Sequence, residues 1–148
     1  MFSKYPAVGF HFLVTFELIG QTPVDTQFQE VSGLDVQFTM ESFNEGGQNR
    51  FSHQLPVRTQ YTQLTLKRGY FIESVLTRWF REAIEDFNIQ PVNLLITLLN
   101  ESHLPVQSWY VVNAFPKKWQ LSNFNAMENN IVFETLVLQY SYFNHIIP

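Results

Sequence analysis

The sequence predicts a mainly β fold, an antiparallel barrel or sandwich with one α-helix packed on it. Residues Phe10–Ile19 alternate in the way that a strand requires, with Phe12, Val14 and Phe16 on one face. Only one segment, about Val75–Phe87, repeats its apolar residues with the period of a helix. The other apolar runs are short and bounded by turn residues, which is typical of antiparallel strands.

The remaining strands follow from the same alternation. They are expected at Phe28–Ser32, Leu34–Phe43, Tyr61–Lys67, Val92–Leu99, Val106–Phe115 and Ile131–Phe143. Gly33 predicts a bulge or bend between the first two of these segments. Residues 44–60 are expected to form a long connection and residues 100–103 a hairpin turn. Residues 116–119 are expected to begin an irregular segment, which has room for a short strand near Trp119–Leu121.

The helix has recognisable end signals. Ser74 can be its N-cap, because a serine hydroxyl accepts a hydrogen bond from an amide of the first turn. Asn88 is a plausible C-terminal stop, and Pro91 lies beyond it. The predicted apolar stripe includes Ile84 and Phe87 in addition to the residues nearer the helix start.

Two strands differ in how their faces are patterned. In the segment 34–43, apolar residues alternate with polar ones, which predicts a half-buried strand with one wet face. The segment 92–99 is apolar on both faces. Since antiparallel sheets in monomers usually leave one face in water, we expect neighbouring copies of the chain to cover part of the apolar surface.

Composition points to a single domain, residues 1–148, with an interaction surface. Apolar residues make up 45% of the chain and aromatic residues 16%, but charged residues only 15% against a usual value of about 25%. A domain of this size normally covers its surface with charge, so protein is expected to cover part of it. The net charge of −4 and the absence of a basic run give no reason to expect binding to nucleic acid.

No catalytic, cofactor-binding or metal-binding residues are expected. The chain has no cysteine, and its four histidines, at positions 11, 53, 103 and 145, do not have the spacing of metal ligands. Glu82, Glu85 and Asp86 fit a solvated helix face better than a pair of catalytic carboxylates. The chain has no stretch of the ~20 apolar residues that cross a bilayer and no secretion signal, so assembly in the cytoplasm without a membrane anchor is expected.

Several segments together resemble a known family. They are FHFLVTF at 10–16, FQEVSGLDV at 28–36, EGGQNRF at 45–51, LTLKRG at 64–69, NAFPKKW at 113–119 and ETLVLQYSYF at 134–143. In this order and spacing, the chain resembles the tail tube proteins of contractile phages and of phage-like contractile injection systems. The resemblance covers residues 6–143.

The resemblance implies a structural protein and not an enzyme. Proteins of this family form hexameric rings with a shared lumenal barrel, and the rings stack into a hollow tube. A lumen of about 40 Å follows if four strands from each of six copies close one barrel. The implied partners are further copies of the chain, a sheath protein, baseplate or spike hub proteins, and the cargo, DNA or protein effectors, that passes through the lumen when the sheath contracts. The implied location is a phage tail, a released extracellular particle or a membrane-tethered one, and type VI secretion tubes share this plan.

Two groups of residues are the candidate sites under this resemblance. The loop that would contact the next ring comprises Asn44, Glu45, Gly46, Gly47, Gln48, Asn49, Arg50 and Phe51. Arg50 and Glu45 are its only charged residues, so each could pair with a neighbouring subunit. The candidate lumen lining is the wet face of the strand that follows Gly33, namely Asp35, Gln37, Thr39 and Glu41.

Two alternative functions stay open. The first is a tube-initiating ring at the baseplate, built on the same fold. The second belongs to a different class, a monomeric β-barrel that binds a small hydrophobic ligand. The first predicts rings, and the second predicts a monomer with an aromatic-lined cavity.

Overall fold

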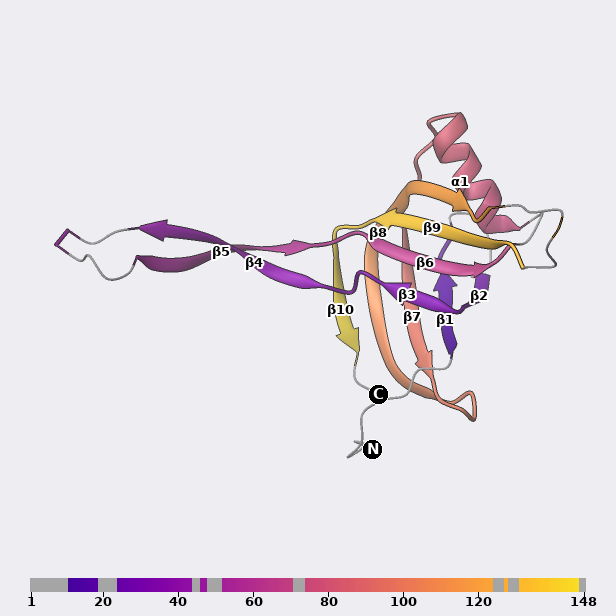
Figure 1. Cartoon of the computed structure of the whole chain (residues 1–148), viewed down its shortest axis with the longest axis horizontal. Helices are drawn as coiled ribbons and strands as arrows, with labels where there is room; N and C mark the ends of the chain where they lie inside the picture. The colour runs from indigo at the N-terminus through magenta and orange to yellow at the C-terminus, as the bar shows by residue number, and fades with distance from the viewer. Residues whose placement is uncertain are drawn as a thin grey trace.

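The computed structural model describes residues 11–18, 24–43, 46–47, 52–70, 74–123, 127 and 131–146. Within these residues the fold is mainly β with one helix, as predicted (Figure 1). The elements are β1 His11–Phe16, β2 Val24–Phe28, β3 Glu30–Ser32, β4 Val36–Phe43, β5 His53–Tyr61, β6 Leu64–Gly69, α1 Val75–Glu85, β7 Val92–Leu99, β8 Pro105–Leu121, β9 Phe133–Gln139 and β10 Tyr142–Ile146.

Two antiparallel sheets share the long strand β8. The strand order is β2-β1-β7-β8-β9-β6-β3, and β10 also pairs with β8. The first part of β8 pairs with β7, and its last part pairs with β9. We call the sheet β8–β9–β6–β3 the β9 sheet. Strands β4 and β5 form a separate hairpin that projects from the body (Figure 1).

The core lies between the two sheets and under α1. Alternating residues of β1, β6, β7 and β9 point into it, which confirms the period-two pattern of the sequence. The fully enclosed side chains among them are Val14, Phe16, Leu64, Leu66, Leu94, Ile96, Leu136 and Leu138. Helix α1 adds Leu76, Trp79, Phe80 and Ala83. Burial of each of the large side chains stabilises the folded chain by roughly 1.5–3 kcal/mol relative to leaving that side chain in water.

Helix α1 begins as predicted and ends earlier. The Oγ atom of Ser74 accepts a hydrogen bond from the Thr77 amide at 3.0 Å, so Ser74 is the N-cap. The helix ends at Glu85, and Phe87 follows with a left-handed φ of 54° and 83% of its surface exposed. Placing Phe87 in the apolar stripe was therefore wrong, and Ile84 is exposed as well. The helix ends before Phe87, so this residue no longer follows the helical spacing of the apolar stripe.

Strand β8 is longer than the sequence predicted. Its 17 residues continue through the segment 116–119, which was expected to be irregular. A register shift between Pro116 and Lys118 accommodates the proline, which has no amide hydrogen for the ladder. The expected strand Ile131–Phe143 is divided instead into β9 and β10, with a break at residues 140–141.

The expected connection at residues 44–60 contains a strand. Its second half is β5, which pairs with β4 from Val36↔Tyr61 to Phe43↔His53. The prediction of a half-buried β4 was also wrong, because Phe38 is 60% exposed within the single chain. Among the described residues, only β5 pairs with β4, and no second layer packs on the hairpin to bury its apolar side.

The helix in the described part of the chain is too short and too polar to cross a membrane.

Candidate functional site

The β4–β5 hairpin has two chemically different faces. Residues directly opposite each other in an antiparallel pair lie on the same face. The pairs Val36↔Tyr61 and Phe38↔Thr59 therefore share one face with Met40, and we call this set the apolar hairpin face. Val36, Phe38 and Met40 are all exposed, and so is Val57, the unpaired residue at the register shift in the hairpin.

The opposite face of the hairpin is polar from Gln37 to Glu41, and beyond the register shift it also carries the exposed residues Leu55 and Phe43. Three of the four candidate lumen residues, Gln37, Thr39 and Glu41, lie on it. Asp35 precedes β4 and lies outside the strand. We call the set Gln37, Thr39, Glu41, Arg58 and Gln60 the polar hairpin face; Gln37 donates to the Gln60 side-chain oxygen at 3.5 Å.

Sequence reasoning missed Arg58 and Gln60 because their segment was expected to be a connection. The alternation of Leu55, Val57, Thr59 and Tyr61 was a signal for a strand. Pro56 lies within that run and argues against a strand, and the register shift beside it shows how the hairpin accommodates the proline.

The apolar hairpin face continues the core side of the β9 sheet. Strand β3 leads into β4, and β5 leads into β6, so the hairpin extends the same two strands away from the body (Figure 1). Tyr61 lies at the junction, where its ring contacts Tyr140 at 6.0 Å and Phe143 at 5.2 Å between centroids. By this continuity, the polar hairpin face continues the outer side of the sheet.

Tyr140 fastens the junction between hairpin and body. Its hydroxyl donates to the Gly33 carbonyl oxygen at 3.1 Å, and its side chain is buried. Burial raises the pKa of Tyr140 from 10.0 to about 12, with smaller contributions from the charge of Asp35 and from Tyr61. The neutral phenol is therefore the form that the fold favours. The buried neutral phenol of Tyr140 contributes fully to the stability of the fold below pH 10. This contribution is lost as the pH rises toward 12 and the phenol ionises.

In an absorbance titration of the tyrosines, we expect the Tyr140→Phe variant to lose a component that titrates near pH 12. Asp35→Asn should move that component to lower pH, because it removes a negative charge near the phenolate. The unfolded wild type in denaturant serves as the control, with all tyrosines near pH 10. If the component that the Tyr140→Phe variant lacks were centred near pH 10 in the wild type, the buried state of Tyr140 would be contradicted.

A buried ion pair connects the β9 sheet to the start of α1. Arg68 Nε donates to Glu134 Oε2 at 2.8 Å, and both side chains are buried. The second oxygen, Oε1, accepts from Trp119 Nε1 at 2.7 Å. Arg68 Nη2 also donates to the Oγ atom of the helix cap Ser74 at 3.1 Å. One carboxylate thus orients Trp119 on β8 and, through Arg68, the first turn of α1.

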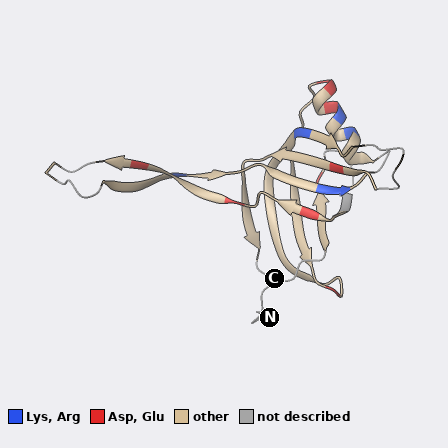
Figure 2. Cartoon of the chain, viewed as in Figure 1, with Lys and Arg blue, Asp and Glu red and all other residues tan. Residues whose placement is uncertain are grey.

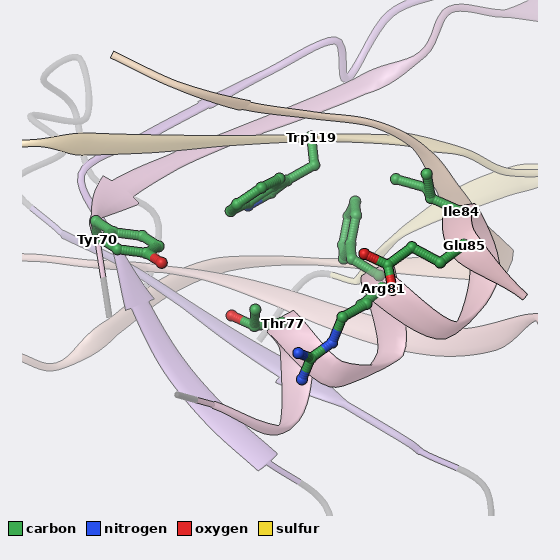
Figure 3. A pocket seen from close by; sticks show the side chains of 7 residues that line it. Tyr70, Thr77, Arg81, Ile84, Glu85 and Trp119 are labelled. Atoms are coloured by element: carbon green, nitrogen blue, oxygen red, sulfur yellow. The ribbon is translucent and has the colours of Figure 1, made fainter. Parts of the chain in front are cut away.

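A groove of about 430 Å³ lies at the surface between α1 and β8 (Figure 3). Apolar and aromatic side chains make up much of its lining, with Arg81, Glu85 and Thr77 as its polar members; the others are Tyr70, Phe80, Ile84 and Trp119. Figure 3 shows Tyr70 and Trp119 on the side facing the helix residues Thr77 and Arg81. The groove lies at the surface, and among its lining residues only Phe80 belongs to the buried core cluster. It is therefore a surface feature and not the interior cavity of a ligand-binding barrel.

Little of the candidate inter-ring loop can be located. Gly46 and Gly47 form a turn between β4 and β5, and Gly47 has a left-handed φ of 86°. Asn44, Glu45, Gln48, Asn49, Arg50 and Phe51 lie outside the described residues.

Among the residues that are described, no group of three or more His, Cys, Asp or Glu side chains could hold a metal ion. Charged residues are sparse on the hairpin and mixed in sign on α1 (Figure 2).

Comparisons with known proteins match this architecture. The family model described as T4-like virus tail tube protein gp19 matches residues 8–144. A chain in the cryo-EM structure of the anti-feeding prophage (AFP) baseplate, 6-fold symmetrised, is 33% identical with a TM-score of 0.89, and the match covers 97% of each chain. A chain in the sheath–tube complex of an extracellular contractile injection system, PVC, in the extended state is 25% identical with a TM-score of 0.78, covering 98% of this chain and 94% of that one.

More distant structures share the fold alone. A type six secretion system protein is 10% identical with a TM-score of 0.64, and the match covers 92% of this chain and 82% of that one. The comparison with curated proteins gave no significant match.

Proposed function

The chain belongs to the family of the T4-like virus tail tube protein gp19, and we propose that six copies close one ring of the tube in a contractile injection particle. It is a tube-like protein of contractile injection systems, and its relatives with solved structures come from such particles. The observation that carries the proposal is the apolar hairpin face. A strand pair that exposes Val36, Phe38 and Met40 on one side needs a cover that the single chain does not provide.

A closed ring removes the exposed strand edges of the hairpin. Unpaired edges otherwise add strands from other molecules and lead to aggregation. In a ring, the apolar hairpin face lies against a neighbouring copy, and the polar hairpin face is directed to the lumen. Gln37, Thr39 and Glu41 then line the passage together with Arg58 and Gln60, and DNA or protein effectors are the cargo.

The turn at Gly46–Gly47 supports a role for the hairpin end in stacking. This turn joins β4 and β5 at the end of the hairpin that is far from the body (Figure 1). We assign the contact with the next ring to the loop 44–51 on this basis and on the family resemblance. Sheath and hub proteins are the further partners in the assembled particle.

Two positions along the tube fit a protein of this kind. The repeating inner-tube subunit is one, and the similarity to a chain of the PVC sheath–tube complex supports it. The ring that initiates the tube at the baseplate is the other. The higher identity and TM-score against a chain of the AFP baseplate, 33% and 0.89, favour this second position. Purified repeating subunits should lengthen into rods, whereas an initiating ring should stop at single rings.

We expect the Phe38→Ser variant to keep its fold and to give a ring yield at least tenfold lower than that of the wild type. Phe38 is 60% exposed, so serine there removes a contact between copies and little of the core. Ring yield is measured by light scattering coupled to size exclusion and by negative-stain microscopy, and the fold by thermal unfolding.

Leu104→Ser is the matched control. Leu104 is exposed to a similar degree, but it lies in the turn between β7 and β8, away from the hairpin. Rings from Phe38→Ser in wild-type yield would contradict the role of the apolar hairpin face. If the wild-type chain stays monomeric even after hub proteins of its particle are added, the proposed function as a whole is contradicted.

A further inference from the structure

Positive charge is unevenly distributed over this acidic chain. The net charge is −4, with nine Lys and Arg residues against thirteen Asp and Glu. Among the described cations, Arg68 is buried in its ion pair, and Arg78 and Arg81 lie on α1. The remaining described cations lie on β5, β6 and β8 (Figure 2), and they are Arg58, Lys67, Lys117 and Lys118. These four residues carry the positive charge that the described strands present to solvent.

Strand pairing places three of these cations on one side of the molecule. Buried residues alternate along β6, and Lys67 belongs to the other set, which points away from the core. Lys118 lies opposite Val137, on the outer side of the β9 sheet. Arg58 belongs to the polar hairpin face, which continues this outer side.

Lys117 reaches over the same side of the sheet. It is the unpaired residue of the register shift in β8, and its Nζ atom donates to Gln63 Oε1 at 2.8 Å. Gln63 directly precedes β6, and β9 lies between β6 and β8, so the Lys117 side chain crosses β9. Because Leu138 fills the core side of β9 there, the crossing lies on the outer side. We call Arg58, Lys67, Lys117 and Lys118 the outer-face cations.

Few acidic residues oppose the outer-face cations. Glu30, on β3, lies opposite Lys67, and the hairpin and its junction with the body add Asp35 and Glu41. In the described part of the chain, none of the outer-face cations takes part in an ion pair. Lys67 lies instead over the Phe133 ring, 5.0 Å from its centroid. Over the rest of the described surface, exposed acids outnumber exposed cations, so positive charge is concentrated on this one side.

In the proposed ring, on which this inference rests, the outer side of the β9 sheet faces the lumen with the polar hairpin face. A concave passage lined mainly by one sign of charge focuses its field and raises the local concentration of ligands of the opposite sign. Single contacts between exposed charges are weak and are screened by salt. An anionic cargo is therefore attracted into the passage and is still free to move along it.

We propose that the outer-face cations make the lumen selective for acidic protein cargo, in which Asp and Glu alternate with uncharged residues. Duplex DNA carries one negative charge per ~1.7 Å of its axis, so an unbroken row of phosphates would also meet Glu30 and Glu41. Carboxylates that are spaced along a polypeptide can meet the cations singly. The half-buried Phe133 beside Lys67 adds a contact for apolar side chains of a protein, which a phosphate backbone lacks.

The test measures binding of a fluorescent peptide of alternating Glu and Ser to assembled rings by anisotropy. We expect binding at low salt and its loss at ~1 M salt, where the screening length is about 3 Å. Lys67→Gln/Lys118→Gln should weaken binding about fivefold or more, and Glu30→Gln should strengthen it about twofold, because the two changes shift the charge of this side in opposite directions. Arg78→Gln/Arg81→Gln is the matched control. It removes the same charge from α1 and should leave the affinity within about twofold of the wild type.

Equal weakening by the two double variants would overturn the inference, because net charge alone would then explain binding. DNA that binds the same rings more tightly than a peptide of equal charge would also overturn it, in favour of a nucleic-acid cargo. If Lys67→Gln/Lys118→Gln does not assemble, Glu30→Gln decides, and an unchanged affinity in that variant counts against the inference. Normal rings that ignore the peptide overturn the selectivity and leave the proposed ring intact. A wild-type chain that never forms rings overturns the proposed function and the inference with it.

Discussion

Replacing Glu134 by glutamine is expected to lower the free energy of unfolding by about 3 kcal/mol or more. The carboxylate is fully buried and accepts hydrogen bonds from Arg68 and Trp119 through its two oxygens. Glutamine has the same shape but only one acceptor oxygen, so its amide group must face one of the two donors. The substitution also removes the negative charge that faces the buried guanidinium of Arg68. Chemical denaturation followed by tryptophan fluorescence measures the loss.

Two further variants separate charge from packing in this network. Glu101→Gln changes an exposed glutamate in the β7–β8 turn and should cost less than about 0.5 kcal/mol. Arg68→Met/Glu134→Leu replaces the ion pair by apolar groups, and it should recover part of the stability because both desolvation costs disappear together. A loss below about 1 kcal/mol for Glu134→Gln would show that the ion pair does not hold the sheet and helix together.

We expect the Gly33→Ala variant to be destabilised by roughly 2–5 kcal/mol, from backbone strain and overpacking combined. Gly33 has a φ of +95°, which a residue with a Cβ atom adopts only at a cost. A Cβ atom there would lie 1.9 Å from the Gln63 carbonyl oxygen, so the backbone between β5 and β6 would have to move. The Gly33 carbonyl also accepts hydrogen bonds from Thr62 and Tyr140, and these contacts would shift with it.

Gly47→Ala is the matched control for the backbone strain. Gly47 also has a left-handed φ, of +86°, but a Cβ atom there would meet nothing within 4 Å. This variant should lose only about 1 kcal/mol, so the difference between the two variants measures the clash at Gly33. Equal losses for the two glycines, measured by thermal and chemical unfolding, would rule out a close backbone approach at Gly33.

Features that depend on near neighbours in the chain were predictable. The strand around Val14 and Phe16 follows from the alternation of apolar residues, and the helix start follows from the ability of Ser74 to cap a first turn. The same alternation placed Gln37, Thr39 and Glu41 on one face of a strand, where the structure also has them. These signals lie within a few residues of one another, so no distant segment is needed to interpret them.

Features that depend on distant segments were not predictable. Whether 53–61 is a loop or a strand was decided by its pairing with β4, and Pro56 obscured the local signal. The pairing of Arg68 with Glu134 joins residues 66 positions apart, and nothing near Arg68 in the chain points to a buried carboxylate. The groove forms only where α1 meets β8, which brings Tyr70 and Trp119 together.

By itself, the sequence determined the fold class, the position of the helix and the alternation of polar and apolar residues along the strands, because local sterics and periodicity control them. The tertiary structure alone decided which apolar face is left uncovered, which strand edges are open and which charges are buried. Those properties depend on the order of strands in the sheets, and that order arises from contacts between segments that are far apart in the chain.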